Sequence, residues 1–223
     1  MPNPTLKMDS VTVLDKDSDG VHLKNSLIHS STTIPASIGA SLVFISSTSS
    51  TSNASELKFE NTFNDTSYYK YVVEAFLYPE TNDRHIRMQL GYGGSSTTWI
   101  TGSYRTIAVE TNFNGSADAT PFDRSSTVAG MELTGTGGSS TDAGAYVTMN
   151  IPRPYESSRY KMWEFKASKQ EQNDYFIHQS GISSWVGGTN AFTAIKFYAH
   201  DYSGGGSHGG INGEVKLYGL KGS

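Results

Sequence analysis

The segment from Asp15 to Gly20 is the one metal-like motif of the sequence, with carboxylates at Asp15, Asp17 and Asp19 followed by glycine. This spacing resembles the start of an EF-hand loop, where oxygen ligands surround Ca²⁺ and glycine allows the sharp turn. Position twelve counted from Asp15 is Ser26 rather than a bidentate glutamate, so the motif is incomplete. We interpret it as a tight turn, keep calcium as the alternative, and predict no metal site and no cofactor.

A second polar cluster, His200, Asp201 and His208, flanks a glycine-rich segment. Adjacent residues of a strand face opposite ways, so His200 and Asp201 are poorly placed to share a ligand. We therefore favour a polar loop over a metal site. The glycine-rich segment itself lacks the lysine of a phosphate-binding loop and is followed by a strand pattern, which argues against a nucleotide site.

Catalytic residues have little support in the sequence. There is no Gly-x-Ser-x-Gly elbow to present a nucleophilic serine. Glycoside hydrolysis needs two carboxylates facing one cleft, and Glu74, Glu110, Glu132 and Glu164 are the candidates on expected strands. The outer face of a sheet carries such residues by default, so we predict that the protein is not an enzyme and keep a glycan-degrading enzyme as the third hypothesis.

Aromatic residues in or beside expected loops offer a binding function. Trp99, Tyr104 and Trp185, with Tyr92 and Tyr202 nearby, are candidates for stacking on sugar rings, and the surrounding Asn, Thr and Ser suit hydroxyl recognition. The alternative is that these side chains cap the ends of a hydrophobic core and keep one edge in water. The sequence leaves both interpretations open, and the core interpretation is favoured.

Composition defines the scaffold that must position these residues. The chain has 223 residues, a formal net charge of -4, 36% hydrophobic and 17% charged residues, 23 glycines and no cysteine. The absence of cysteine excludes disulfides, thiolate metal sites and cysteine nucleophiles. The lysines and arginines are scattered, which argues against nucleic-acid binding. We expect no secretory signal and no membrane insertion, because no apolar run is long enough.

The hydrophobic pattern predicts strands separated by turns. Residues 71–78 form an apolar run that ends at Pro79, and alternation of apolar and polar residues marks 57–60, 86–90 and 146–151. Further strands are expected at 42–45, 104–109, 131–133, 160–167, 175–177, 194–198 and 215–220. The tract 46–55 and the stretch 112–126 are expected to be loops. About ten antiparallel strands with little or no helix predict an all-β sandwich of jelly-roll type.

We divide the chain into residues 1–35 and 36–223. The first part is the most charged and least aromatic, and we expect an attachment arm with one or two edge strands, or else the first strand of the sandwich. The second part is the expected sandwich domain.

Two blocks carry a family resemblance. The first runs from Tyr68 through Tyr78 and Pro79 to Asp83 and on to Ser95, and the second comprises 195–198 and Ile211 to Leu220. Together they are similar to virion structural proteins of marine tailed phages, in which a strand ending in Y-x-Y leads to a P-x-T-D turn and a final strand reads G-x-(V/I)-x-L-Y-G. The similarity covers about Ser41 to Leu220 and transfers no functional residues.

The resemblance implies a virion protein on the particle surface, either a capsid decoration or cement protein or the head domain of a tail fibre. Its expected partners are other capsid or tail proteins and copies of itself, with a trimer suiting threefold capsid or fibre sites, and a host surface glycan. A lectin-like module that recognises a receptor glycan is the second hypothesis.

Overall fold

The computed structural model describes the backbone of residues 6–8, 11–17, 20–23, 42–81, 84–113, 117–126, 130–134, 144–170, 176–201 and 208–221. Side chains are described in these ranges from residue 42 onward, except for 112–126, 201 and 208. The chain separates into two compact units, Met1–Ala40 and Ser41–Gly222. The division therefore lies slightly later than the boundary expected after Pro35.

The first unit contains a three-stranded antiparallel sheet of its own. Its strands are β1 (Leu6–Met8), β2 (Val11–Asp17) and β3 (Gly20–Leu23), in the order β1-β2-β3. Asp17 pairs with Gly20, so the Asp15–Gly20 motif lies on a β-hairpin. The side chains of Asp15 to Asp19 lie outside the described residues, and calcium binding there stays a hypothesis.

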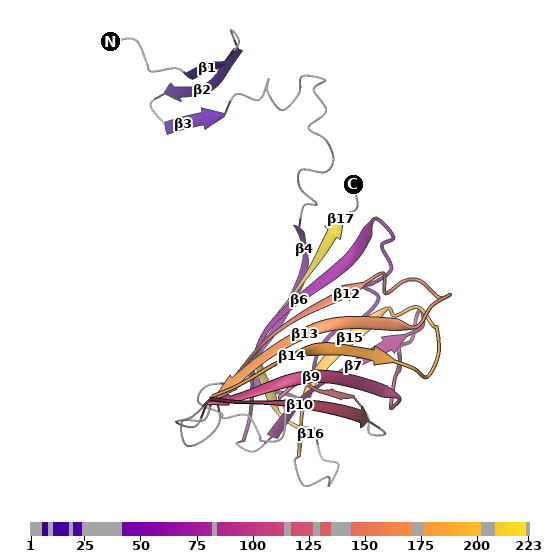
Figure 1. Ribbon diagram of the computed structural model, residues 1–223. Helices are drawn as coiled ribbons and strands as arrows, with labels where there is room; N and C mark the ends of the chain where they lie inside the picture. The colour runs from indigo at the N-terminus through magenta and orange to yellow at the C-terminus, as the bar shows by residue number, and fades with distance from the viewer. Residues whose placement is uncertain are drawn as a thin grey trace. The chain divides into compact units, whose positions relative to one another are not determined.

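The second unit is built from two antiparallel sheets. The large sheet has the order β10-β9-β14-β13-β12-β6-β17-β4, and its strands lie side by side in Figure 1. They are β4 (Leu42–Ala54), β6 (Tyr68–Pro79), β9 (Tyr104–Phe113), β10 (Ala117–Ser126), β12 (Ala145–Pro152), β13 (Lys161–Gln170), β14 (Phe176–Trp185) and β17 (Ile211–Lys221).

The small sheet has the order β11-β7-β15-β16, with β5 also paired to β15 and β8 paired to β7. Its strands are β5 (Leu57–Phe59), β7 (Arg84–Tyr92), β8 (Thr98–Trp99), β11 (Met131–Glu132), β15 (Ala194–Asp201) and β16 (His208–Gly209). The described ranges of the chain contain no helix. None of the described residues therefore forms a helix that could cross a membrane.

The core lies between the two sheets, as the alternation of side chains dictates. Tyr71, Val73 and Leu77 of the large sheet are fully buried, and so are Met88 and Phe197 of the small sheet. Two antiparallel sheets around one hydrophobic core confirm the predicted all-β sandwich. The strand order, with β12, β13 and β14 as a meander, does not establish the finer jelly-roll connectivity.

Two segments expected to be loops are strands. The serine- and threonine-rich tract 46–55 lies largely within β4, and the stretch 112–126 contains the end of β9 and all of β10, which form a hairpin. Both β4 and β10 are edge strands of the large sheet, so their polarity is compatible with pairing on one side only. Local composition was therefore a wrong guide to these segments.

The two blocks that carry the family resemblance include two strands that are neighbours in the large sheet, β6 and β17. Glycines in β17 are required by this contact. Gly213 has a φ of 119°, in the region that side chains rarely adopt, and a Cβ on Gly219 would lie 2.3 Å from the Tyr68 ring. The final-strand motif is thus a packing requirement near one edge of the large sheet, where β17 lies between β6 and the edge strand β4.

Candidate functional site

Tyr104 belongs to the core, which corrects its assignment as a glycan-stacking candidate. Its side chain is 0% exposed. The hydroxyl accepts a hydrogen bond from the Leu90 N–H (3.0 Å) and donates one to the Ile100 carbonyl (3.3 Å). Burial raises the pKa of Tyr104 above its ordinary value. A ring enclosed in this way has no face to offer to a sugar.

Trp185 is also mostly buried, at 6% exposure, and packs against Tyr92 (ring centroids 6.2 Å apart) and Phe192 (5.7 Å). Trp99 is half-buried, and the Lys196 ammonium lies 4.6 Å from its ring centroid. This placement agrees with the interpretation of these residues as caps of the core. The side chain of Tyr202 lies outside the described residues.

The structure nevertheless brings three of these aromatic residues to one surface pocket of about 350 Å³. Tyr92, Trp99 and Trp185 line it together with the hydroxyl-bearing residues Thr98, Thr101 and Ser103. The pocket combines small aromatic surfaces with hydroxyl groups, which is the chemistry that a sugar requires. It is the only feature of the described surface that favours the glycan-binding hypothesis.

The carboxylates considered for glycan hydrolysis do not face one another. Glu74 and Glu164 point away from the core on strands β6 and β13, and β12 separates them by about 12 Å between Cα atoms. Glu110 is buried and accepts a hydrogen bond from Gln179 Nε2. Glu132 lies on the small sheet. The four residues therefore occupy three separate surfaces.

A polar cluster on the outer side of the small sheet was not anticipated. His85 Nδ1 lies 2.6 Å from Glu132 Oε1, and Arg87 lies 3.9 Å from Glu132 Oε2. Burial raises the pKa of Tyr198 to about 12, while the neighbouring Arg87 guanidinium acts in the opposite direction. Pairing of β7 with β11 and β15 assembles this cluster from distant parts of the sequence.

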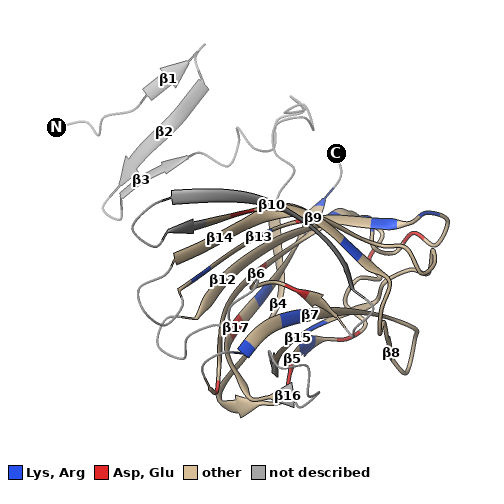
Figure 2. Ribbon diagram, turned by 60° about the horizontal axis from the view of Figure 1, so that its bottom comes forward, with Lys and Arg blue, Asp and Glu red and all other residues tan. Residues whose placement is uncertain are grey.

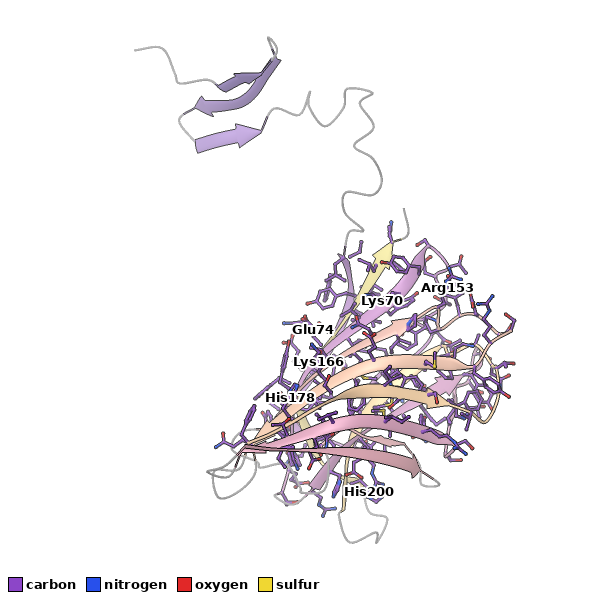
Figure 3. All side chains as sticks on the ribbon, viewed as in Figure 1. Lys70, Glu74, Arg153, Lys166, His178 and His200 are labelled. Atoms are coloured by element: carbon purple, nitrogen blue, oxygen red, sulfur yellow. The ribbon has the colours of Figure 1, made fainter. Side chains whose placement is uncertain are left out.

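His200, labelled in Figure 3, pairs with both His85 and His208 across strands. Within the part of the chain whose side chains are described, no group of three histidine, aspartate or glutamate residues is arranged to hold a metal ion. The side chains of Asp201 and His208 lie outside that part.

The largest candidate site is the outer face of the large sheet, meaning the side chains of its strands that point away from the core. It carries nine of the twelve exposed large hydrophobic residues of the described surface. They are Leu42, Phe44, Phe76, Ile107, Val109, Tyr146, Met162, Phe176 and Ile182. An exposed apolar surface of this kind marks a site of interaction.

Ile182 stands at the centre of three hollows on the outer face, of about 350, 280 and 560 Å³, all of which it lines. Its side chain is 53% exposed, and the neighbouring Ile107 is 71% exposed. The surface therefore presents both projecting apolar side chains and adjacent depressions. Alternation between them is what close packing against another protein needs.

Charges on the outer face are few and of both signs. Lys70, Glu74 and Lys166 are labelled in Figure 3, and most of the surrounding ribbon of β6, β12, β13 and β14 is uncharged in Figure 2. Glu164 lies two residues before Lys166 on the same side of β13. The face thus combines projecting apolar side chains with polar groups and charges of both signs, of which Glu214 and Lys216 form an ion pair at 3.0 Å.

Comparisons of the chain with protein-family models, with curated proteins and with solved structures found no match.

Proposed function

We propose that this chain is a non-enzymatic structural protein of a tailed-phage virion, displayed on the particle surface as a capsid decoration or cement protein or as the head domain of a fibre. The observation that carries the proposal is the outer face of the large sheet, where exposed hydrophobic residues gather on the strands. Such a face suits a protein whose work is to assemble with other proteins.

Two further features support an assembly role. The motifs that resemble marine phage virion proteins include the neighbouring strands β6 and β17 near one edge of the large sheet, where glycines of β17 are needed for packing against β6. The first unit has its own sheet and precedes the sandwich, an arrangement that suits an attachment segment to a capsid or tail.

The copy number of the protein in purified virions tests this proposal. Quantitative mass spectrometry against the major capsid protein of the encoding phage gives the number directly. Hundreds of copies per particle are expected for a capsid decoration, and a few to a few dozen for a fibre or tail component. Absence from particles that are complete and infectious would refute the proposal.

The pocket formed by Tyr92, Trp99 and Trp185 favours a second candidate, a lectin-like receptor-binding module. Trp99 is the residue to change, because it is only half-buried whereas Trp185 is part of the core. Binding on a glycan array that is lost in Trp99→Ala, with an unchanged melting temperature, would support this function. A broad array without any binding would count against it.

A further inference from the structure

The outer face of the large sheet is complementary to a rotated copy of itself. Cross-strand pairing arranges its central residues in two parallel rows. One row contains Tyr218, Val72, Asn150, Glu164, Ile182 and Ile107. The second contains Lys216, Glu74, Thr148, Lys166, Ser180 and Val109. The rows lie two residues apart on the same side of each strand, on either side of Phe165 in β13.

We infer that a second copy of this chain covers the outer face, large sheet against large sheet. The two copies are related by a twofold axis that lies between the faces and runs across the strands, passing over β13 at the level of Phe165. Rotation about such an axis places the first row of one copy over the second row of the other. This inference deepens the proposed function, because it names the partner that the exposed apolar face would bind in the assembled particle.

The axis brings matching chemistry together at the centre of the contact. Glu164 of one copy meets Lys166 of the second copy, and the symmetry repeats the pair. Asn150 meets Thr148, and Ile107 meets Val109. Isologous contacts require this kind of self-complementarity. The other three positions pair unlike groups, with Val72 opposite Glu74, Ile182 opposite Ser180 and Tyr218 opposite Lys216.

The same axis also places projecting side chains of one copy beside hollows of the other copy. Ile182 of one copy stands over Ser180 of the other, beside the hollow of about 350 Å³ that Ser180, Gly181 and Lys166 line. Ile182 is 53% exposed in the single chain, so it projects far enough to enter. Charge pairing and shape therefore point to one arrangement.

The face is also large enough. Seven strands at about 4.8 Å spacing and some eight residues at about 3.4 Å give roughly 30 Å by 27 Å, or about 800 Å². A stable protein–protein interface buries about 800 Å² on each partner. A contact between the large sheets alone therefore reaches the size that a specific dimer needs.

Sedimentation equilibrium of the full chain at a series of concentrations tests the inference. The wild-type chain is expected to dimerise, and Ile182→Glu is expected to raise the dimer Kd at least tenfold. Thr98→Glu is the matched control, since it adds the same charge to an exposed residue of the small sheet and is expected to leave the Kd within twofold. A wild-type chain that stays monomeric, or an unchanged Kd in Ile182→Glu, would overturn the inference.

Charge reversal provides a second, independent readout. Glu164→Lys and Lys166→Glu each place like charges opposite one another and are expected to weaken the dimer. The double variant restores both pairs and is expected to recover most of the affinity. Failure of the double variant to recover would exclude this axis. Virion copy number is unaffected by these results, so a monomer that is present in particles would refute the dimer and leave the proposed function standing.

Discussion

Replacing Tyr104 with phenylalanine tests whether this residue is structural. The substitution keeps the buried ring and removes only the hydroxyl, which accepts from the Leu90 N–H at 3.0 Å and donates to the Ile100 carbonyl at 3.3 Å. Because the site is fully buried, water cannot replace the lost partner of Leu90. A buried donor left without an acceptor costs about 1–3 kcal/mol of folding free energy.

For a unit of this size each kcal/mol corresponds to a fall in melting temperature of about 2–4 °C, so Tyr104→Phe is expected to lower Tm by roughly 2–12 °C. Urea unfolding monitored by tryptophan fluorescence gives the free energy, and calorimetry gives Tm. Tyr160→Phe is the control, because Tyr160 is 65% exposed. A Tyr104→Phe variant within 0.5 kcal/mol of wild type, a limit of about the size of ordinary surface substitutions, would refute the reasoning.

Two further predictions concern stability. Burial raises the pKa of Tyr71 and of Tyr198 to about 12. Since the unfolded chain loses these protons near pH 10, the stabilising contribution of each tyrosine is constant below about pH 10 and falls by about 2–3 kcal/mol as pH rises to 12. Absorbance at 295 nm should show these tyrosines ionising only as the fold is lost, and titration of every tyrosine near pH 10 in a folded chain would contradict this. Separately, Asn212 accepts from the Asn53 N–H (2.7 Å) and donates to the Asn53 side chain, which joins β17 to β4. Asn212→Ala is expected to cost about 1–2 kcal/mol in urea unfolding, and exposed Asn190→Ala serves as control; equal stabilities would disprove the role of the pair.

Strong alternation made much of the sandwich predictable. The apolar run at 71–78 lies within β6, and Leu57 and Phe59 are buried on either side of exposed Lys58. At 104–109 both sides of the strand are apolar, so the sequence left its direction open. The structure buries Tyr104 and Ala108 and exposes the isoleucine and valine between and beyond them on the outer face.

The candidate site depended on information that spacing does not contain. Trp185 and Trp99 have similar neighbours in sequence, yet Trp185 is covered by Tyr92 and Phe192 while Trp99 stays half-exposed. The two rows of the outer face join residues from six strands, and their alignment follows from register between strands far apart in the chain. Long-range register of this kind is not specified by local patterns.

The pairing of β4 with β17 has a consequence for folding rate. Leu42 pairs with Leu220, 178 positions later, and β17 lies between β4 and β6 in the large sheet. The first strand of the sandwich therefore cannot pair in the large sheet until the last strand is in place. Closing so long a loop costs roughly 4–5 kcal/mol of chain entropy. Contacts of such long range slow folding, so we expect the sandwich to fold in milliseconds to seconds, with β4 among the last strands to acquire protection from hydrogen exchange.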